Sequence, residues 1–259
     1  MSSYVKYKVP IKNFKILDID DSVITDKKIS YSKEAEIKGE KIVLNISLQE
    51  IEMDNNIFAV KVICDKDLSE KDLMPLAIKY VNNLLNKIAF YSQNAEVGEP
   101  WIVDEHTKDK KIGTTEIYGS VFVSTENRDK KLLENLCKEI KQGSNFDNED
   151  YNLFRAAMNN EDIVVKYMFL YQILSFQHLN SKGVESQKMV DEYIKSKCTK
   201  EEYKPQNSGY KGKEETIYTR LRNQVGHYRW KTSQQTRRDM SAKMQDLIKL
   251  VKKSITDNN

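Results

Sequence analysis

The sequence predicts an α+β protein, with a strand-rich N-terminal α+β domain over residues 1–127 and an all-helical domain over residues 128–259. The main observation is a change of period near Asn127. Before it, apolar residues mostly alternate with polar ones, and after it they recur every three or four positions. The second observation is length, because 259 residues can bury a sizeable core and typically form one or two domains.

The N-terminal half contains two strong strand candidates. In Glu36–Ile51, four apolar residues alternate with polar neighbours: Ile42, Leu44, Ile46 and Leu48. The stretch Ile57–Cys64 is almost continuously apolar, which is typical of a buried strand. The turn-forming residues 54–56 lie between them and predict a hairpin.

Weaker strands are expected at Phe14–Ile19, Trp101–Asp104 and Glu116–Ser124, with a helix capped by Ser69 and running to Ile88. Asp104-Glu105-His106 could supply metal ligands, but neighbouring residues on a strand point to opposite faces. We therefore expect no metal site there, and no cofactor. This half carries no catalytic constellation, and sensing or partner binding is its expected role.

The C-terminal half predicts a series of helices. Their expected ranges are Lys130–Gln142, Asn148–Met158, Ile163–Leu179, Val184–Lys197 and a last helix from Ser233 to about Ile255. The third is apolar nearly all round, so we expect it to be the central buried helix. His178, which follows its buried part, is expected to be structural or to cap the helix.

Charge is distributed unevenly along the chain. Residues 1–127 hold 17 Lys and Arg against 21 Asp and Glu, a net charge of −4, whereas residues 128–259 hold 25 against 18, a net charge of +7. The segment Tyr203–Arg238 alone has nine basic and two acidic residues. Such a cluster suits a phosphate backbone, although a solvated basic face would give the same count.

Nothing in the sequence predicts a membrane or secretory protein. No apolar run reaches the roughly 18 residues of a membrane span, and the N-terminus has no signal-peptide pattern. The three cysteines are far apart and lack metal-ligand spacing. We therefore expect a cytoplasmic protein that does not contact a membrane.

The basic cluster contains the stretch Lys213–Arg229, which predicts a helix. Glu214 and Glu215 would lie in its first turn, where the helix dipole favours negative charge. One apolar stripe is expected, made of Ile217, Leu221, Val225 and Tyr228. At roughly 100° per residue, Asn223 and His227 would lie one turn apart on the opposite side, with Arg222 at its edge.

The motif Arg222-Asn223-Gln-Val-Gly-His227 resembles the Arg-x4-His signature of the HEPN superfamily of all-helical domains, in which a polar residue, often Asn, follows the arginine. The resemblance covers roughly Arg128 to the C-terminus. It implies a metal-independent endoribonuclease of a toxin or antiviral defence system. It also implies a homodimer whose motif helices form one site, with an antitoxin or another regulatory partner.

The three motif residues suit RNA cleavage by the internal 2′-hydroxyl. Histidine ordinarily titrates near pH 6.5, so His227 can act as a base or an acid. The guanidinium of Arg222 matches phosphate oxygens, and Asn223 could orient His227 or hold such an oxygen. Flanking RNA contacts are expected from Arg220, Tyr228, Arg229, Trp230, Lys231, Arg237 and Arg238.

The products would carry 2′,3′-cyclic phosphate and 5′-hydroxyl ends. In a straight helix Arg222 and His227 point roughly 140° apart, so either the helix bends at Gly226 or the groups come from two chains. Two other functions remain open: a HEPN-like module that binds RNA or nucleotide without cutting it, and a DNA-binding or adaptor protein that uses the basic amphipathic helix Ser233–Ile255.

Overall fold

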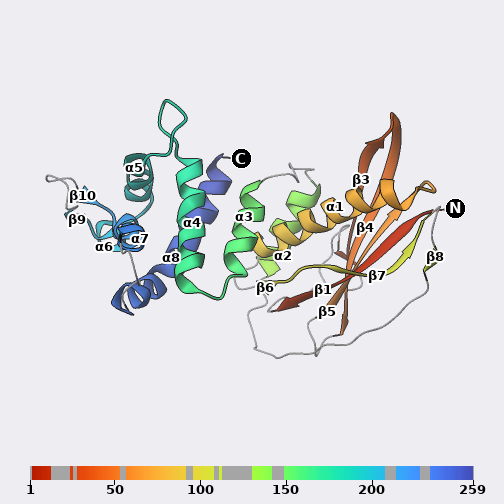
Figure 1. Cartoon of the computed structure of the whole chain (residues 1–259), viewed down its shortest axis with the longest axis horizontal. Helices are drawn as coiled ribbons and strands as arrows, with labels where there is room; N and C mark the ends of the chain where they lie inside the picture. The colour runs from red at the N-terminus through yellow and green to blue at the C-terminus, as the bar shows by residue number, and fades with distance from the viewer. Residues whose placement is uncertain are drawn as a thin grey trace. The chain divides into compact units, whose positions relative to one another are not determined.

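The computed structural model describes residues 2–12, 24–25, 28–52, 57–91, 96–107, 111–112, 130–141, 149–207, 214–227 and 234–258. The chain forms two compact units, Met1–Tyr151 and Asn152–Asn259. The first contains a β-sheet and helices, and the second is mainly helical (Figure 1). The predicted α+β class is confirmed.

An antiparallel sheet forms the framework of the first unit. Its strand order is β2-β3-β4-β5-β1-β7-β8, with the short β6 also paired to β1. The bounds are β1 Tyr4–Lys12, β2 Ile24–Thr25, β3 Lys28–Ile37, β4 Glu40–Glu52, β5 Ile57–Cys64, β6 Glu96–Val97, β7 Trp101–His106 and β8 Lys111–Ile112. The predicted pairing of β4 with β5 and the strand at Trp101 are confirmed.

One predicted strand is wrong in extent. The stretch Glu36–Ile51 is divided by a tight turn at Lys38 and Gly39, and the residues before the turn belong to β3. Both turn residues have positive φ, 52° and 82°, a conformation that glycine adopts without steric cost and lysine does not. Strand β1 continues through Pro10.

The strands expected at Phe14–Ile19 and Glu116–Ser124 and the turn at 54–56 lie outside the described residues.

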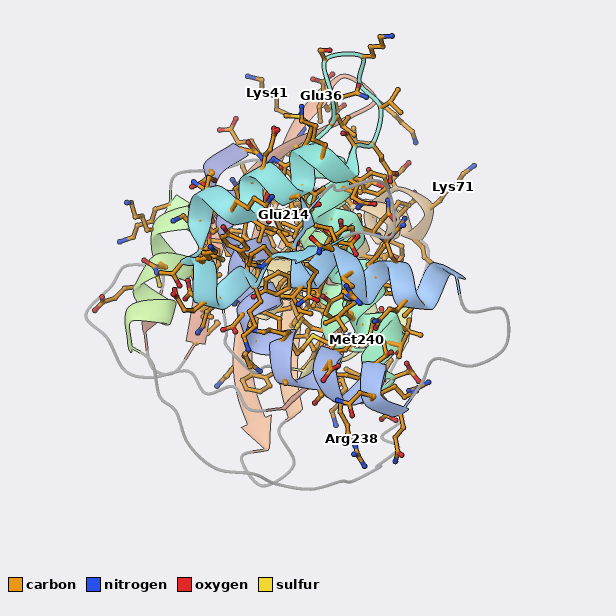
Figure 2. The ribbon with its side chains drawn as sticks, turned by 90° about the vertical axis from the view of Figure 1, so that its left-hand side faces the viewer. Glu36, Lys41, Lys71, Glu214, Arg238 and Met240 are labelled. Atoms are coloured by element: carbon orange, nitrogen blue, oxygen red, sulfur yellow. The ribbon has the colours of Figure 1, made fainter. Side chains whose placement is uncertain are left out.

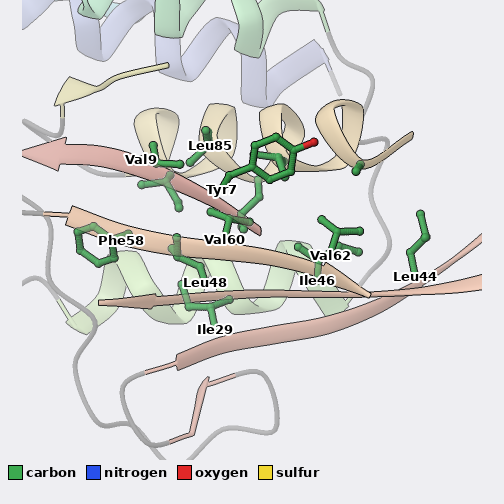
Figure 3. Close-up of a cluster of buried hydrophobic side chains, with 14 of the residues drawn as sticks. Tyr7, Val9, Ile29, Leu44, Ile46, Leu48, Phe58, Val60, Val62 and Leu85 are labelled. Carbon is green, nitrogen blue, oxygen red and sulfur yellow. The ribbon is translucent and has the colours of Figure 1, made fainter. Parts of the chain in front are cut away.

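Helix α1, Glu70–Tyr91, covers one face of this sheet, in agreement with the predicted helix. Ser69 caps it, because the Ser69 hydroxyl accepts the N–H of Asp72 at 3.3 Å. The buried cluster combines the inward residues of the strands, such as Tyr7, Leu48 and Val60, with Leu85 of the helix (Figure 3). Alternation along each strand therefore assigns one face to the core and leaves the other outside.

Helix α2, Lys130–Lys141, contributes Leu136, Cys137 and Ile140 to the same cluster. It therefore belongs to the first unit, and the division of contacts falls at Tyr151, later than the division at residue 127 that the sequence suggested. From Lys130 onward the described elements are mainly helices. A change of period marks where helices begin, however, and does not tell against which core a helix packs.

The second unit consists of short and long helices around α4. Its elements are α4 Ile163–Gln177, α5 Gln187–Lys197, α6 Lys200–Tyr203, β9 Gln206–Asn207, β10 Glu214–Glu215, α7 Ile217–His227 and α8 Gln234–Asn258, preceded by α3, Glu149–Met158. Helix α4 contacts α5, α7 and α8. It is the central helix that its composition predicted.

Two details of this unit bear on the predicted functions. The apolar face of α8 is buried, including Met240, Leu247 and Val251. That face is therefore not available to a partner, which argues against the adaptor function. His178 caps the C-terminus of α4 and its Nε2 lies 2.8 Å from Ser254 Oγ, so the predicted structural role is confirmed.

A buried lysine in the first unit provides a test of this packing. Lys87 of α1 is 1% exposed, and its Nζ lies 3.8 Å from Glu139 Oε2 of α2. Burial lowers the pKa of Lys87 to about 8, although the Glu139 carboxylate acts in the opposite direction. The unfolded chain, with an ordinary lysine pKa of about 10.4, binds this proton more tightly than the folded one.

Replacing Lys87 with methionine should therefore stabilise the protein at pH 7, by about 1–2 kcal/mol. The advantage should shrink as the pH rises from about 8 to about 10.4, because the wild type then loses the buried charge. Urea unfolding of both proteins at the two ends of this range measures the difference. The exposed Lys71→Met variant is the control, and an advantage that does not depend on pH would contradict the assignment.

Candidate active site on helix α7

Helix α7 begins one residue after Thr216, which caps it. The N–H of Thr219 donates to Thr216 Oγ1 at 3.3 Å, and the N–H of Arg220 donates to the Thr216 carbonyl oxygen at 3.0 Å. The prediction that Glu214 and Glu215 occupy the first helical turn is wrong. They form strand β10, which pairs with β9, because the helix cap lies after them.

The cap is held by a buried carboxylate from another helix. Asp191 of α5 is 6% exposed. Its Oδ1 accepts from the backbone N–H of Thr216 at 3.0 Å, from the Thr216 hydroxyl at 2.6 Å and from the Thr219 hydroxyl at 2.7 Å. A buried carboxylate needs such donors to replace water. Asp191 therefore fixes the start of α7 against α5.

Two tyrosines of α4 hold the same helix from a second side. The Tyr167 hydroxyl donates to the Tyr218 carbonyl oxygen at 3.0 Å, and the Tyr171 oxygen lies 2.8 Å from Thr219 Oγ1. Because Thr219 uses its own proton on Asp191, Tyr171 is the donor in this pair. Burial raises the pKa of both tyrosines above their ordinary value, so both keep their protons.

The side-chain amide of the motif asparagine, Asn223, is hydrogen-bonded to other residues of the chain. Asn223 Nδ2 donates to Glu215 Oε2 at 3.0 Å and to Gln187 Oε1 at 3.3 Å. Glu215, which is 8% exposed, also accepts from Gln187 Nε2 at 3.4 Å. The expectation of a solvent-facing amide is therefore wrong. Both amide protons are used, so binding of phosphate by Asn223 would require these bonds to break.

The motif arginine is close to this amide. Arg222 Nη1 donates to Asn223 Oδ1 at 3.1 Å, and the Arg222 guanidinium carbon lies 5.9 Å from the centre of the Tyr171 ring. The arginine is half-buried. Its donor to Asn223 and its position over Tyr171 hold the guanidinium in one place, and a planar fork fixed in this way is suited to a phosphate group.

The buried face of α7 is rotated relative to the predicted stripe. Leu221 is buried, as expected, but Ile217 and Val225 are only half-buried, and Tyr228 lies outside the described residues. Tyr218 and Thr219 are fully buried in their place. The polar contacts of Thr219 with Asp191 and Tyr171 account for the rotation, because they draw this side of the helix inward.

His227 is the last residue of α7 and lies one helical turn after Asn223. This spacing along a helix corresponds to the same side of α7 as the amide. Its side chain lies outside the described residues.

The residues predicted to bind RNA differ in their contacts within the structure. Arg220 Nη1 donates to the Asn207 carbonyl oxygen at 3.3 Å, and Arg237 Nη1 lies 3.0 Å from Asp162 Oδ2, the carboxylate that caps α4. Arg238 projects from α8 into solvent (Figure 2). The remaining four residues, Tyr228, Arg229, Trp230 and Lys231, lie outside the described residues.

Sequence reasoning missed the residues that support the motif: Asp191, Gln187, Glu215, Thr216, Thr219 and Tyr171. One signal was available. Asp191 lies beside Val190 and three residues before Ile194, and both of these apolar residues are buried. A carboxylate in the apolar stripe of a helix is expected to have a buried partner. The identity of that partner, 25 residues further along the chain, cannot be inferred from periodicity.

In the part of the chain that the structure describes, no helix combines the length and the apolar character needed to cross a bilayer. In the same part, no group of three or more His, Cys, Asp or Glu side chains lies close enough to share a metal ion. The side chains of Asp104, Glu105 and His106 lie outside that part.

Comparisons of the chain with family models, with curated proteins and with solved structures give no match.

Proposed function

We propose that helix α7 carries the active site of a metal-independent, HEPN-like endoribonuclease that acts in a toxin or antiviral defence system. The observation that carries the proposal is the fixed Arg222–Asn223 pair one turn before His227. Glu215 and Gln187 hold the amide, and the amide holds the guanidinium. Attack by a 2′-hydroxyl on phosphate requires a base, such as a histidine, and a preorganised cation.

In this mechanism His227 removes the proton of the 2′-hydroxyl, and the oxygen attacks the adjacent phosphorus. The bond from phosphorus to the 5′-oxygen of the next nucleotide breaks, and that oxygen takes up a proton. Arg222 stabilises the negative charge that accumulates on the phosphate oxygens. Asn223 orients Arg222 and does not contact the substrate.

The proposal is tested by incubating the protein with mixed RNA in excess EDTA. We expect cleavage at the same rate with and without the chelator, because neither the base nor the cation is a metal. Loss of cleavage in EDTA with recovery on addition of Mg²⁺ or Mn²⁺ would contradict the mechanism. Calcium is the control, since it replaces divalent charge without supporting most Mg²⁺-dependent nucleases.

We further propose that the site is shared between two copies of the chain. Arg222 and His227 point roughly 140° apart on one helix, and Arg222 is held over Tyr171, so one α7 does not direct both groups at one phosphate. Mixing Arg222→Ala with His227→Ala chains should restore activity, because some heterodimers regain one intact pair. No recovery, together with a monomer in light scattering, would contradict a shared site.

A second candidate function is binding of RNA or nucleotide without cleavage. It is favoured by one observation: the protons of Asn223 and one donor of Arg222 are used inside the chain, as in a structural hydrogen-bond network. The two functions differ in whether any RNA product forms.

A further inference from the structure

The outward face of the sheet in the first unit carries a regular arrangement of polar side chains. Along β1 and β5 the residues between the buried ones face outward, and strand pairing aligns them into rows. One row is Ser30, Ser47, Lys61, Lys6 and Asp104, from β3 to β7, and the side chain of Asp104 lies outside the described residues. The next row is Lys28, Gln49, Ala59, Lys8 and Trp101, from β3 to β7. We call these two rows the outer sheet face.

Two lysines of this face lie directly opposite each other. Lys6 of β1 pairs with Lys61 of β5, and the neighbours of both residues are buried, so both side chains leave the sheet on the same side. Directly opposed side chains are about 5 Å apart at Cβ, and like charges in this position destabilise a sheet. Lys6 also pairs in register with Asp104 of β7, and Lys61 Nζ lies 4.2 Å from the centre of the Tyr4 ring. A bound anion would add to these contacts and further reduce the repulsion.

An exposed indole lies beside a third lysine. Trp101 pairs with Lys8 across β1 and β7 and is 40% exposed, although large aromatic side chains are usually well buried. Lys8 follows Lys6 at two residues along β1, a distance of about 6.8 Å. Three lysines and one tryptophan are therefore neighbours in register on one face of the sheet.

Apart from Ala59, which is buried, the remaining side chains of the two rows can form hydrogen bonds. Serines and a glutamine occupy the outward positions of β3 and β4, and Lys28 adds a fourth ammonium at the far end. Together the two rows hold four lysines and one aspartate, Asp104. The face is thus basic within a unit whose sequence is acidic overall.

We propose that the outer sheet face binds single-stranded nucleic acid. Lys6, Lys61 and Lys8 would contact phosphates, and Trp101 would stack on a base, which is how open basic surfaces with aromatic side chains hold single strands. An acidic peptide would satisfy the lysines, but it would gain no stacking on Trp101. The inference rests on the first unit alone and does not depend on cleavage at α7.

Binding is measured by fluorescence anisotropy with the full chain and a short labelled single strand of mixed sequence. RNA with 2′-O-methyl groups and DNA of the same sequence are both used, because neither can be cut through a 2′-hydroxyl. We expect the double variant Lys6→Gln/Lys61→Gln to weaken binding about fivefold or more and to reduce the salt slope by about 1.4 for its two contacts. Trp101→Ala should weaken binding about tenfold.

The matched control is Lys71→Gln/Lys138→Gln, which removes the same charge from exposed positions of α1 and α2 and should leave binding within about twofold. In a Trp230→Phe background, stacking should also quench the fluorescence of Trp101. The quenching measurement uses a chain whose sheet residues are all unchanged.

Three results would overturn the inference: the same affinity and salt slope in both variants and the wild type, no quenching of Trp101, or equal competition by polyglutamate. Arg222→Ala and His227→Ala chains should bind the uncut strands through this face as the wild type does. A failure of the proposed cleavage and a failure of this surface are therefore distinguishable.

Discussion

Replacing His227 with alanine is expected to lower the rate of RNA cleavage by about 10²–10⁴-fold, the usual contribution of a general base. The reason is that the motif contains no other general base, since neither a guanidinium nor an amide group offers a basic lone pair. Affinity for RNA should change by less than about threefold, because the cations that hold phosphate remain. The measurement is single-turnover cleavage alongside anisotropy with a 2′-O-methyl strand.

The comparison needs a control for folding. His227 is the last residue of α7, so its replacement should leave the unfolding midpoint within about 1 °C of the wild type. The exposed Lys253→Ala variant in α8 removes one charge at a position outside the site and should cleave normally. If His227→Ala retained cleavage within a few-fold of the wild type, His227 would not be the base, and another group of the protein would have to take the 2′-hydroxyl proton.

The second large effect is expected from Asp191. Replacing it with alanine removes the acceptor of three protons, those of the Thr216 N–H and of the Thr216 and Thr219 hydroxyls, and leaves them buried. Buried donors without acceptors cost about 1–3 kcal/mol each in unfavourable cases, and we expect a total loss of about 3–5 kcal/mol. Urea unfolding followed by circular dichroism measures it.

The neighbouring Glu192 is the matched control. It lies on the same helix, its side chain is 54% exposed, and it pairs with Lys188 at 3.6 Å. Glu192→Ala should therefore change the free energy of unfolding by less than about 0.5 kcal/mol. Adding Thr219→Val to Asp191→Ala should cost less than the sum of the two single changes, because both remove the same bond. Equal effects of Asp191→Ala and Glu192→Ala would contradict the network.

The sequence predicted the elements whose apolar pattern is strong and local. The strand Ile57–Cys64 and the helix near Ile163–Leu179 are clear examples, since a nearly continuous apolar run leaves few alternatives. The turn at Lys38 and Gly39 was missed because the first position is a lysine, whereas the residues that usually mark such a turn are asparagine and aspartate. The packing of α2 on the first unit was missed because it depends on contacts between distant residues.

The same difference between local pattern and distant contacts applies to the candidate site. The order Arg222, Asn223, His227 on one helix follows from the sequence alone. The contacts of Asn223 with Glu215 and Gln187, eight and 36 residues away, could not be predicted from the sequence. They require β10 and the start of α5 to meet α7. Nor could periodicity show that Thr219 is buried, since a threonine enters a core only when partners such as Asp191 are present.

The most direct test of the proposed mechanism is the identity of the product ends on a substrate with one 2′-deoxy residue. If the internal 2′-hydroxyl is the nucleophile, the upstream product ends in a 2′,3′-cyclic phosphate and the downstream product begins with a 5′-hydroxyl. Cutting should then fail at the deoxy residue alone, while binding stays nearly unchanged because phosphate contacts dominate affinity. Products with 5′-phosphate and 3′-hydroxyl ends, or equal cutting at the deoxy residue, would show that another nucleophile acts and would contradict the roles proposed for His227 and Arg222.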